Sequence, residues 1–231
     1  MKAPVVAVIQ ARMGSSRLPN KMMLWLHGMP VVEWVWRRVA MTKQIDRTVF
    51  AIPDTPADQV LADYLLRIGA AVFRGSESDV LGRMTEAARR QGTQTVIRVC
   101  ADNPLICGSE IDRLIDYYQE GDYDYAYNHI PRGNTYPDGL GAEIASMDLF
   151  ELMFREAVTP DQRQHAFNYV WDHPERFRIG TCDPLDEFLA HPELKLDLDT
   201  SADYAALLKL NIHPEMGASE VVTTALQCSR S

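Results

Sequence analysis

The sequence predicts an α/β protein: a single layered domain, residues 1–231, in which helices flank a mainly parallel (mixed) central sheet. Short runs rich in β-branched residues alternate with stretches whose apolar residues recur at helical spacing. That alternation is typical of a parallel sheet covered by helices. The 231 residues contain no internal repeat, low-complexity tract or linker, and a chain of this length buries a substantial core.

Four strand-and-helix pairs fill the first half of the chain. The expected strands are 5–9, 48–52, 70–73 and 95–99, and the expected helices are 30–43, 56–69, 78–91 and 109–119. Ligands of such sheets lie at the carboxyl ends of the strands. We therefore expect the loop after the first strand and the segment CADNPL after the fourth to open onto one edge.

The pattern is less regular after Tyr123. We expect antiparallel pieces at 122–128 and 143–145, helices near 147–157 and 161–173, strands near 176–180 and at 194–200, and a helix from about Ser201. The alternating tyrosines of 122–128 fit either a subunit interface or packing within the sheet. Trp25, Trp34 and Trp36 fit core or interface packing, and Arg37 and Arg38 fit a solvated helix face.

Composition and charge narrow the partners and the compartment. A net charge of −9 argues against a surface that binds nucleic acid. The four cysteines include no CxxC pair, which favours a reducing, cytoplasmic compartment. The apolar run at 5–9 is too short for a signal peptide, and no stretch approaches a membrane span.

A basic loop, QARMGSSRLPNK, follows the first strand at residues 10–21. Its cations are Arg12, Arg17 and Lys21, and no carboxylate occurs before Glu33. The backbone around Gly14, Ser15 and Ser16 can form an anion-binding concavity. The loop is neither a P-loop nor a GxGxxG motif. It predicts either a phosphate site or, less specifically, a solvated basic turn.

Three aspartates are candidates for a metal site. Asp102 follows the fourth expected strand, and Asp197 and Asp199 lie two apart in KLDLDT, on one face of an expected strand. Each also fits a turn, a helix cap or an exposed acidic face. If Asp102 and Asp199 meet, they form a hard-oxygen site suited to Mg²⁺ with substrate phosphates. The cations and carboxylates together predict a bound metal–triphosphate.

Five stretches occur in one order: ARMGSSRLPNK, FRGSESDVL, CADNPL, YPDGLGAEI and LDLDTSADY. In these the chain resembles the cytidylyltransferase family of the spore-coat polysaccharide biosynthesis protein F type, related to CMP-sialate and CMP-Kdo synthetases. The resemblance spans about Val5 to Leu207. It implies a nucleotide-diphosphosugar-transferase-like fold and a homodimer. It also implies Mg²⁺-dependent attack of an acidic sugar's hydroxyl on the α-phosphate of CTP, which gives CMP-sugar and pyrophosphate.

The resemblance also assigns site residues by motif position. The implied nucleotide site comprises Ala11, Arg12, Gly14, Ser15, Ser16, Arg17, Lys21, Arg74 (at the base), Cys100 and Ala101. The implied catalytic residues are Arg12, Lys21, Asp102 and Asp199; the metal ligands are Asp102 and Asp199 with Asp197 as an additional one; and the acceptor residues are Asp138, Glu143 and His165. The irregular subregion at about 123–175 is expected to bind the acceptor and to contribute to a dimer.

Three positions depart from the family pattern. Cys100 stands where a glutamine of the sialate and Kdo enzymes helps to read cytosine, Gln164 replaces a glutamate before His165, and Asn20 replaces a glycine. Another nucleoside triphosphate or a phosphonate acceptor therefore stays an alternative. So does a glycosyltransferase, although the basic loop argues against it. A noncatalytic nucleotide-binding subunit is a further alternative, and the complete set of cations and aspartates argues against that one.

Overall fold

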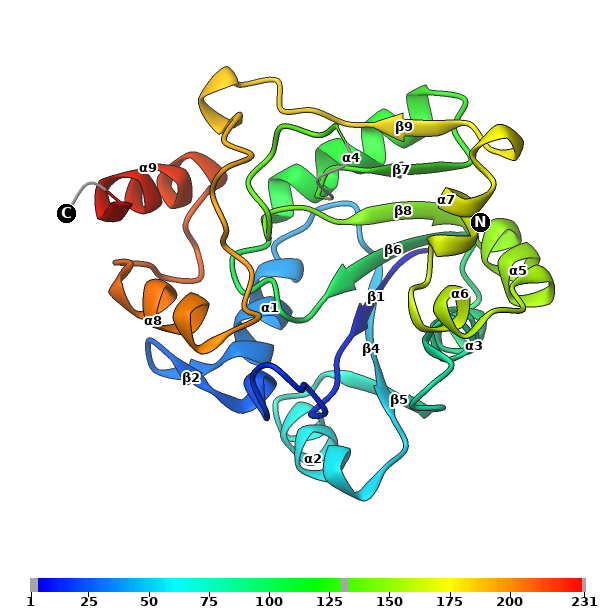
Figure 1. The fold of residues 1–231 in the computed structure, drawn as a ribbon, viewed down its shortest axis with the longest axis horizontal. Coiled ribbons are helices and arrows are strands. Elements are labelled where there is room, and N and C mark those ends of the chain that lie inside the picture. The colour runs from blue at the N-terminus through cyan, green and yellow to red at the C-terminus, as the bar shows by residue number, and fades with distance from the viewer. Residues whose placement is uncertain (1–3, 130–132, 230–231) are drawn as a thin grey trace.

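The computed structural model describes residues 4–129 and 133–229, and a seven-stranded sheet forms its centre (Figure 1). The strands are β1 (Val5–Gln10), β4 (Arg47–Pro53), β5 (Ala71–Gly75), β6 (Thr95–Cys100), β7 (Tyr125–Tyr127), β8 (Glu143–Ser146) and β9 (Ile179–Thr181), with a separate hairpin of β2 (Trp25–Leu26) and β3 (Met29–Pro30). The helices are α1 (Val31–Val39), α2 (Gln59–Arg67), α3 (Val80–Arg90), α4 (Gly108–Glu120), α5 (Met147–Glu156), α6 (Pro160–Gln164), α7 (Asn168–Asp172), α8 (Ser201–Lys209) and α9 (Ala218–Ser229). Short 3₁₀ turns occur at Lys21–Met23, Pro56–Asp58, Pro174–Arg176 and Glu187–Leu189.

The sheet is mainly parallel and mixed, as predicted. Its order is β5-β4-β1-β6-β8-β7-β9. β1 is parallel to β4 and β6, and β4 is parallel to β5. β8 runs antiparallel to its neighbours β6 and β7, and β9 is parallel to β7. The chain builds outward from β1 to β4 and β5, then crosses to β6 on the other side of β1. Such a switch leaves a crevice at the carboxyl ends of the strands, where ligands bind.

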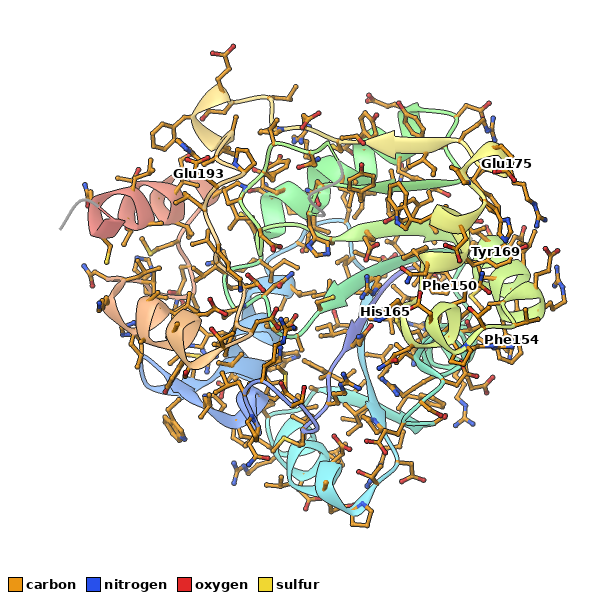
Figure 2. The ribbon with its side chains drawn as sticks, viewed as in Figure 1. Phe150, Phe154, His165, Tyr169, Glu175 and Glu193 are labelled. Carbon is orange, nitrogen blue, oxygen red and sulfur yellow. The ribbon has the colours of Figure 1, made fainter. Side chains whose placement is uncertain are left out.

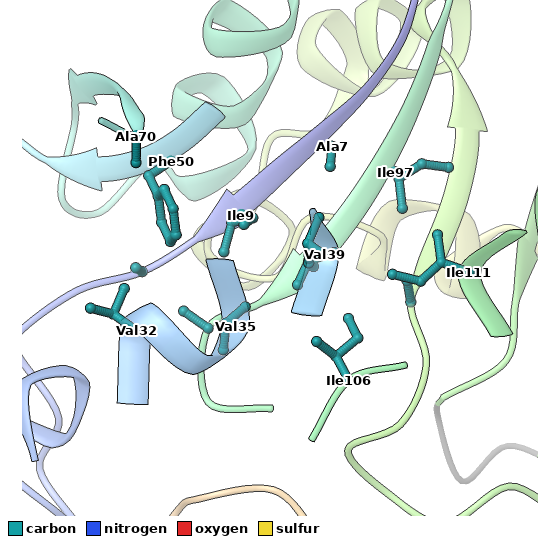
Figure 3. Close-up of a cluster of buried hydrophobic side chains, with 14 of the residues drawn as sticks. Ala7, Ile9, Val32, Val35, Val39, Phe50, Ala70, Ile97, Ile106 and Ile111 are labelled. Atoms are coloured by element: carbon teal, nitrogen blue, oxygen red, sulfur yellow. The ribbon is translucent and has the colours of Figure 1, made fainter. Parts of the chain in front are cut away.

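Helices cover both faces of the sheet because its central strands are apolar on both sides. α1, α2 and α4 pack on one face, and α3 and α5 pack on the other. Within β1, Ile9 joins the first cluster and Val8 the second, since successive side chains of a strand point to opposite faces. Figure 3 shows Ile9 among apolar side chains of α1, including Val35 and Val39. Each such fully buried side chain contributes about 1.5–3 kcal/mol to folding.

A third apolar cluster joins the β2–β3 hairpin to α8 and α9, which lie on the left of Figure 1 beyond the carboxyl ends of β1 and β6. Trp34 is fully buried in this cluster, and its indole N–H donates to the carbonyl of Leu26 at 2.6 Å. Trp34 therefore packs within the chain. The hairpin and α9 are elements that the sequence pattern did not predict.

The predicted antiparallel pieces are confirmed as β7 and β8. Tyr125 and Tyr127 are buried between the sheet and Phe167 of the neighbouring segment, so these tyrosines pack within the chain. The helix predicted at 161–173 divides into α6 and α7. α6 begins at a capping box between Thr159 and Gln162.

The strand predicted at 194–200 is wrong. Its pairing is reduced to one isolated parallel bridge between Asp138 and Lys195. Leucines alternate with Lys and Asp here as they do in a half-buried strand. Leu196 and Leu198 are buried in the third cluster. The segment, however, lies against loops and does not pair with an edge strand of the sheet.

The prediction of a solvated face for Arg38 is also wrong. Its side chain is buried, and its guanidinium donates to four backbone carbonyls from two distant segments. Arg37, one residue earlier, is half-exposed and pairs with Glu33. Within the described ranges, no helix is both long enough and apolar enough to cross a membrane.

Candidate active site

A cavity of about 170 Å³ lies at the carboxyl ends of β1 and β6. Three segments that are far apart in the chain line it: the basic loop, the end of β6 and the segment before α8. The predicted site residues among its lining are Ala11, Arg12, Ser15, Ser16, Arg17, Lys21, Cys100, Asp102 and Asp199. Gly14 and Ala101 are not lining residues, although Ser15, Cys100 and Asp102 next to them are. The predicted convergence of the loop with two distant aspartates is therefore present in the structure.

Lys21 connects the two aspartates. Its Nζ donates to Asp102 Oδ2 at 2.7 Å and to Asp199 Oδ1 at 3.0 Å. A third hydrogen bond, of 2.8 Å, joins it to the carbonyl of Leu198. Since one ammonium contacts both carboxylates, the two aspartates can share one cation.

The neighbouring charges shift the pKa values of Lys21 and Asp199. Burial alone would lower the pKa of Lys21, but Asp102 and Asp199 outweigh burial and raise it. Burial alone would raise the pKa of Asp199, but Lys21 and then Arg17 hold it below its usual value. The lysine stays charged and Asp199 stays ionised near neutral pH.

The other two cations of the loop differ in their partners. Arg17 Nη2 lies 2.9 Å from Asp199 Oδ2, and its side chain is 64% exposed. Arg12 lines the cavity and forms no ion pair with a carboxylate of the described residues. Its guanidinium is therefore available to an anion from solution.

A buried carboxylate fixes the start of the loop. Asp58 is 2% exposed, and its Oδ1 accepts a 2.7 Å hydrogen bond from the backbone N–H of Met13. Thr55 donates its hydroxyl proton to the other oxygen at 2.6 Å. Near the end of the loop, Asn20 adopts φ 60°, a left-handed conformation that asparagine tolerates better than most residues. The replacement of a glycine by Asn20 is thus compatible with the loop geometry.

Backbone contacts bring the C-terminal segment to the cavity. The N–H of Leu198 donates to the carbonyl of Asp102 at 2.7 Å, which places Asp199 beside Asp102. The same segment passes close to Gly139, where a Cβ atom would lie 2.7 Å from the backbone nitrogen of Asp197. Gly139 also has φ +102°, so both the close contact and the backbone conformation disfavour a side chain at this position.

Asp197 does not join the pair formed by Asp102 and Asp199 in the cavity. Its Oδ1 lies 2.8 Å from Lys195 Nζ, and it is not a lining residue. Burial raises its pKa despite Lys195, and the nearby charge of Asp138 acts in the same direction. The structure therefore brings together two of the three predicted metal ligands.

A second cavity, of about 230 Å³, adjoins the first, and Cys100 lines both. Two predicted acceptor residues, Glu143 and His165, line it together with His129, Phe167 and Trp171. Figure 2 shows His165 on the side of the molecule that carries α5 to α7, whereas Glu193, in the C-terminal segment, lies on the opposite side. Apart from the shared Cys100, the two cavities are lined by different parts of the chain.

A buried ion pair links the cavities. Arg98 of β6 pairs with Glu143 of β8, directly across the antiparallel register, and Glu143 is 1% exposed. The Nε and Nη2 atoms of Arg98 both lie 3.3 Å from Gln10 Oε1, which lines the first cavity. Burial alone would lower the pKa of Arg98, but Cys100 and Glu143 outweigh it and raise that pKa above its usual value.

His129 is held among acidic partners. Its Nδ1 lies 3.8 Å from Asp138 Oδ1 and its Nε2 lies 4.0 Å from Glu143 Oε2. Burial would lower its pKa, but Asp138, Cys100 and Glu143 raise the pKa of His129 to about 10. The second cavity therefore contains an imidazolium near neutral pH.

Arg74 lies away from both cavities. It extends from the edge strand β5, with Nε 3.1 Å from Asp54 Oδ1 and Nη2 donating to the carbonyl of Thr55 at 2.8 Å. These contacts hold it beside the start of α2. The structure does not bring Arg74 together with the residues that surround Lys21.

Sequence reasoning missed Gln10, Asp58, Arg98 and His129. Arg98 carried a usable signal, because a charged residue inside a central apolar strand requires a partner. The other three carried none, since each acts through a contact with a distant part of the chain.

Comparisons with known proteins show which family this chain belongs to. A family model described as Cytidylyltransferase matches residues 6–213. The spore coat polysaccharide biosynthesis protein SpsF of Bacillus subtilis (strain 168) is 30% identical over 230 residues, covering 95% of this chain and 92% of that protein.

Two solved structures share the fold. A cytidylyltransferase from Leptospira borgpetersenii serovar Hardjo-bovis (strain JB197) aligns with TM-score 0.91 at 24% identity, covering 99% of this chain and 96% of that one. CMP:2-keto-3-deoxy-manno-octonic acid synthetase complexed with CTP aligns with TM-score 0.66 at 16% identity, covering 99% and 100%. The family match spans nearly the whole chain, so this chain belongs to the cytidylyltransferase family and is a nucleotidyltransferase.

Proposed function

We propose that this enzyme transfers CMP from CTP to the hydroxyl group of an acidic sugar, with Mg²⁺ as cofactor and pyrophosphate as the second product. The observation that carries the proposal is the meeting of Arg12, Arg17 and Lys21 with Asp102 and Asp199 around one cavity. Nucleotidyl transfer needs this combination, because it depends on positioning and on neutralising charge more than on covalent participation of the protein.

The cations would hold the triphosphate. In the reaction, the acceptor oxygen bonds to the α-phosphorus, the bond from that phosphorus to the oxygen that bridges the α- and β-phosphates breaks, and the hydroxyl proton passes to solvent water. The departing pyrophosphate gains negative charge. Arg12, which has no carboxylate partner among the described residues, and the exposed Arg17 are available to offset that charge.

The two carboxylates fit a divalent metal. The described residues contain no cluster of three or more His, Cys, Asp or Glu side chains placed to hold one. Mg²⁺, however, is commonly held by one or two carboxylates together with substrate phosphates and water. The Lys21 ammonium occupies the place that the metal ion would take, because it contacts both Asp102 and Asp199. Held there, Mg²⁺ would supply positive charge next to the phosphates.

The second cavity supports an acceptor site beside the nucleotide. It shares Cys100 with the first cavity, so an acceptor bound there would lie next to the phosphates. His129 and His165 offer hydrogen-bond donors, and Phe167 and Trp171 offer apolar surface to a sugar ring. Cytosine and an acidic sugar are proposed from the family resemblance, with Glu143 and Asp138 as acceptor-side residues.

An assay of pyrophosphate release tests the proposal. The protein is incubated with each nucleoside triphosphate in turn, Mg²⁺ and a panel of acidic sugars. We expect release that requires both CTP and one of the acids. Equal pyrophosphate release with another nucleoside triphosphate would contradict the proposed preference for CTP. Release with a phosphonate acceptor alone would show that the acceptor is a phosphonate and not an acidic sugar. Formation of a nucleoside diphosphate from a nucleotide-sugar would contradict nucleotidyl transfer and support glycosyl transfer.

We propose the homodimer and the role of 123–175 on the same resemblance. Among the exposed large apolar side chains of the described residues, Val158 is the one that falls within that subregion. Sedimentation equilibrium decides the matter, because the monomer mass is 26.1 kDa and a dimer has twice that mass. A monomer at micromolar concentration would remove the dimer from the proposal.

A further inference from the structure

The Lys21 ammonium makes more hydrogen bonds within the chain than is expected of a residue that binds a phosphate. Its ammonium donates to Asp102, to Asp199 and to the carbonyl of Leu198, at 2.7, 3.0 and 2.8 Å. A lysine ammonium has three protons to donate and accepts none. All three are used inside the chain, so a phosphate oxygen can bind Lys21 only if at least one of these bonds is given up.

The same ammonium holds both carboxylates that the proposed metal needs. The Lys21 side chain is 10% exposed, against 30% for Asp102 and 20% for Asp199, so the cation lies deeper than the groups it neutralises. A divalent ion that approaches this pair meets a positive charge of the protein already in contact with both. Arg17 reaches Asp199 alone and is 64% exposed, so it interferes far less.

We infer that Lys21 competes with the metal for Asp102 and Asp199, and that the nucleotide ends this competition by drawing the ammonium onto its phosphates. The inference rests on the proposed function. It predicts that the free metal binds weakly and that the metal and the triphosphate bind together. The enzyme would thereby bind the metal–nucleotide complex in preference to the free ion.

Direct binding of Mn²⁺ tests the inference. The probe is Mn²⁺ alone, with no nucleotide, and the free ion is measured by electron paramagnetic resonance. Lys21→Met should bind Mn²⁺ at least about tenfold more tightly than the wild type, the change expected when one charged hydrogen-bond partner is removed from the carboxylates. The same variant should bind CTP more weakly, because the phosphates lose a cation. The two affinities thus change in opposite directions.

Lys195→Met is the matched control. Lys195 pairs with Asp197 at 2.8 Å and with Asp203 at 2.9 Å, and not with Asp102 or Asp199. Lys195→Met removes the same charge from the segment that carries Asp199, so a general electrostatic effect would appear in both variants. Competition predicts the gain in Lys21→Met only. The double variant Lys21→Met/Asp199→Asn should lose that gain.

Folding is checked separately, since Lys21 is buried. Lys21→Gln keeps a donor for the Leu198 carbonyl without the charge, and melting temperature and circular dichroism report the fold of each variant. Unchanged or weaker Mn²⁺ binding in folded Lys21→Met and Lys21→Gln would overturn the inference, as would an equal gain in Lys195→Met. Wild-type pyrophosphate release from CTP does not depend on these titrations. Failure of the proposed function and failure of the inference are therefore distinguishable.

Discussion

At the scale of single residues, Arg12 has the simplest environment in the cavity. It lines the cavity without an ion pair to any described carboxylate. Arg12→Ala should therefore leave the free energy of unfolding unchanged and reduce kcat/KM for CTP about 10- to 150-fold, which corresponds to the loss of about 1.5–3 kcal/mol from one hydrogen bond to a charged group. Steady-state pyrophosphate assays measure the effect. Arg47→Ala is the control, because Arg47 begins β4 and donates to the carbonyl of Gln91. Equal kinetics in both variants would remove Arg12 from the site.

His129 makes the protein's stability depend on pH. The folded pKa of His129, about 10, lies above the usual histidine value of 6.5, so its contribution is complete below pH 6.5 and is lost as the pH rises through 10. Between these limits the free energy of unfolding should fall with pH by up to about 1.4 kcal/mol per unit more in the wild type than in His129→Gln. Urea titrations across pH 6–10 measure both proteins. His165→Gln, on a 59% exposed side chain, serves as control. Parallel curves for wild type and His129→Gln would contradict the assignment.

Site residues that stand out within one stretch of sequence could be predicted. Site residues that depend on contacts between separate parts of the fold could not. Arg12, Arg17 and Lys21 stand out because their loop lacks carboxylates, and that property is local. The role of His129 depends on Asp138 and Glu143, which reach it only after the chain has folded. Arg74 lies in a family motif, yet the fold pairs it with Asp54 at the far edge of the sheet.

At the scale of elements, the pairing of β6 with β8 carries a charge pair into the sheet. Arg98 and Glu143 face each other in the antiparallel register, with side chains 13% and 1% exposed. Arg98→Met leaves Glu143 buried without its cation and should lower the free energy of unfolding by about 3–5 kcal/mol. Adding Glu143→Gln should recover part of this loss, because the unpaired charge is removed. Chemical denaturation measures all three proteins.

The control for this pair is a surface pair of similar chemistry. Arg178 contacts Asp122 and Asp124 and is 55% exposed, so Arg178→Met should cost at most about 1 kcal/mol. A loss in Arg98→Met no larger than that of Arg178→Met would show that the pair is not a buried one. A double variant no more stable than Arg98→Met would show that the uncompensated charge is not the cause.

The elements of the first half were predictable because each carries its own periodicity. β1 and β6 are apolar apart from Gln10, Thr95 and Arg98, since both of their faces are covered, and α3 presents one apolar face from Val80 to Ala88. The segment 194–200 has the alternation of a strand, but among the described residues no strand lies beside it to complete a ladder. Alternation reports which side chains are buried, whereas pairing depends on the neighbour that the fold supplies.

At the scale of the whole molecule, the third cluster must be held against the sheet, and Arg38 does this. Its guanidinium donates to the carbonyls of Leu105 and Ile106, which follow β6, and to those of Pro214 and Met216, which precede α9, at 2.6–3.2 Å. It thus joins α1 to the segment that follows β6 and to the segment that precedes α9. The segment of α9 packs through Val221 and Val222 into the same cluster.

Arg38→Met should therefore loosen the C-terminal part before the sheet. The variant leaves four carbonyls without their donor, and an unsatisfied buried polar group costs about 1–3 kcal/mol, so a loss of at least about 3 kcal/mol is expected. Hydrogen exchange should increase first in the amides of α9, while those of β1 stay protected. Arg37→Met is the matched control, since Arg37 is half-exposed and pairs with Glu33 within α1. Uniform exchange across the sheet and α9 would mean that Arg38 stabilises the entire fold as one unit, and an unchanged stability would mean that the α9 segment is held by its apolar contacts alone.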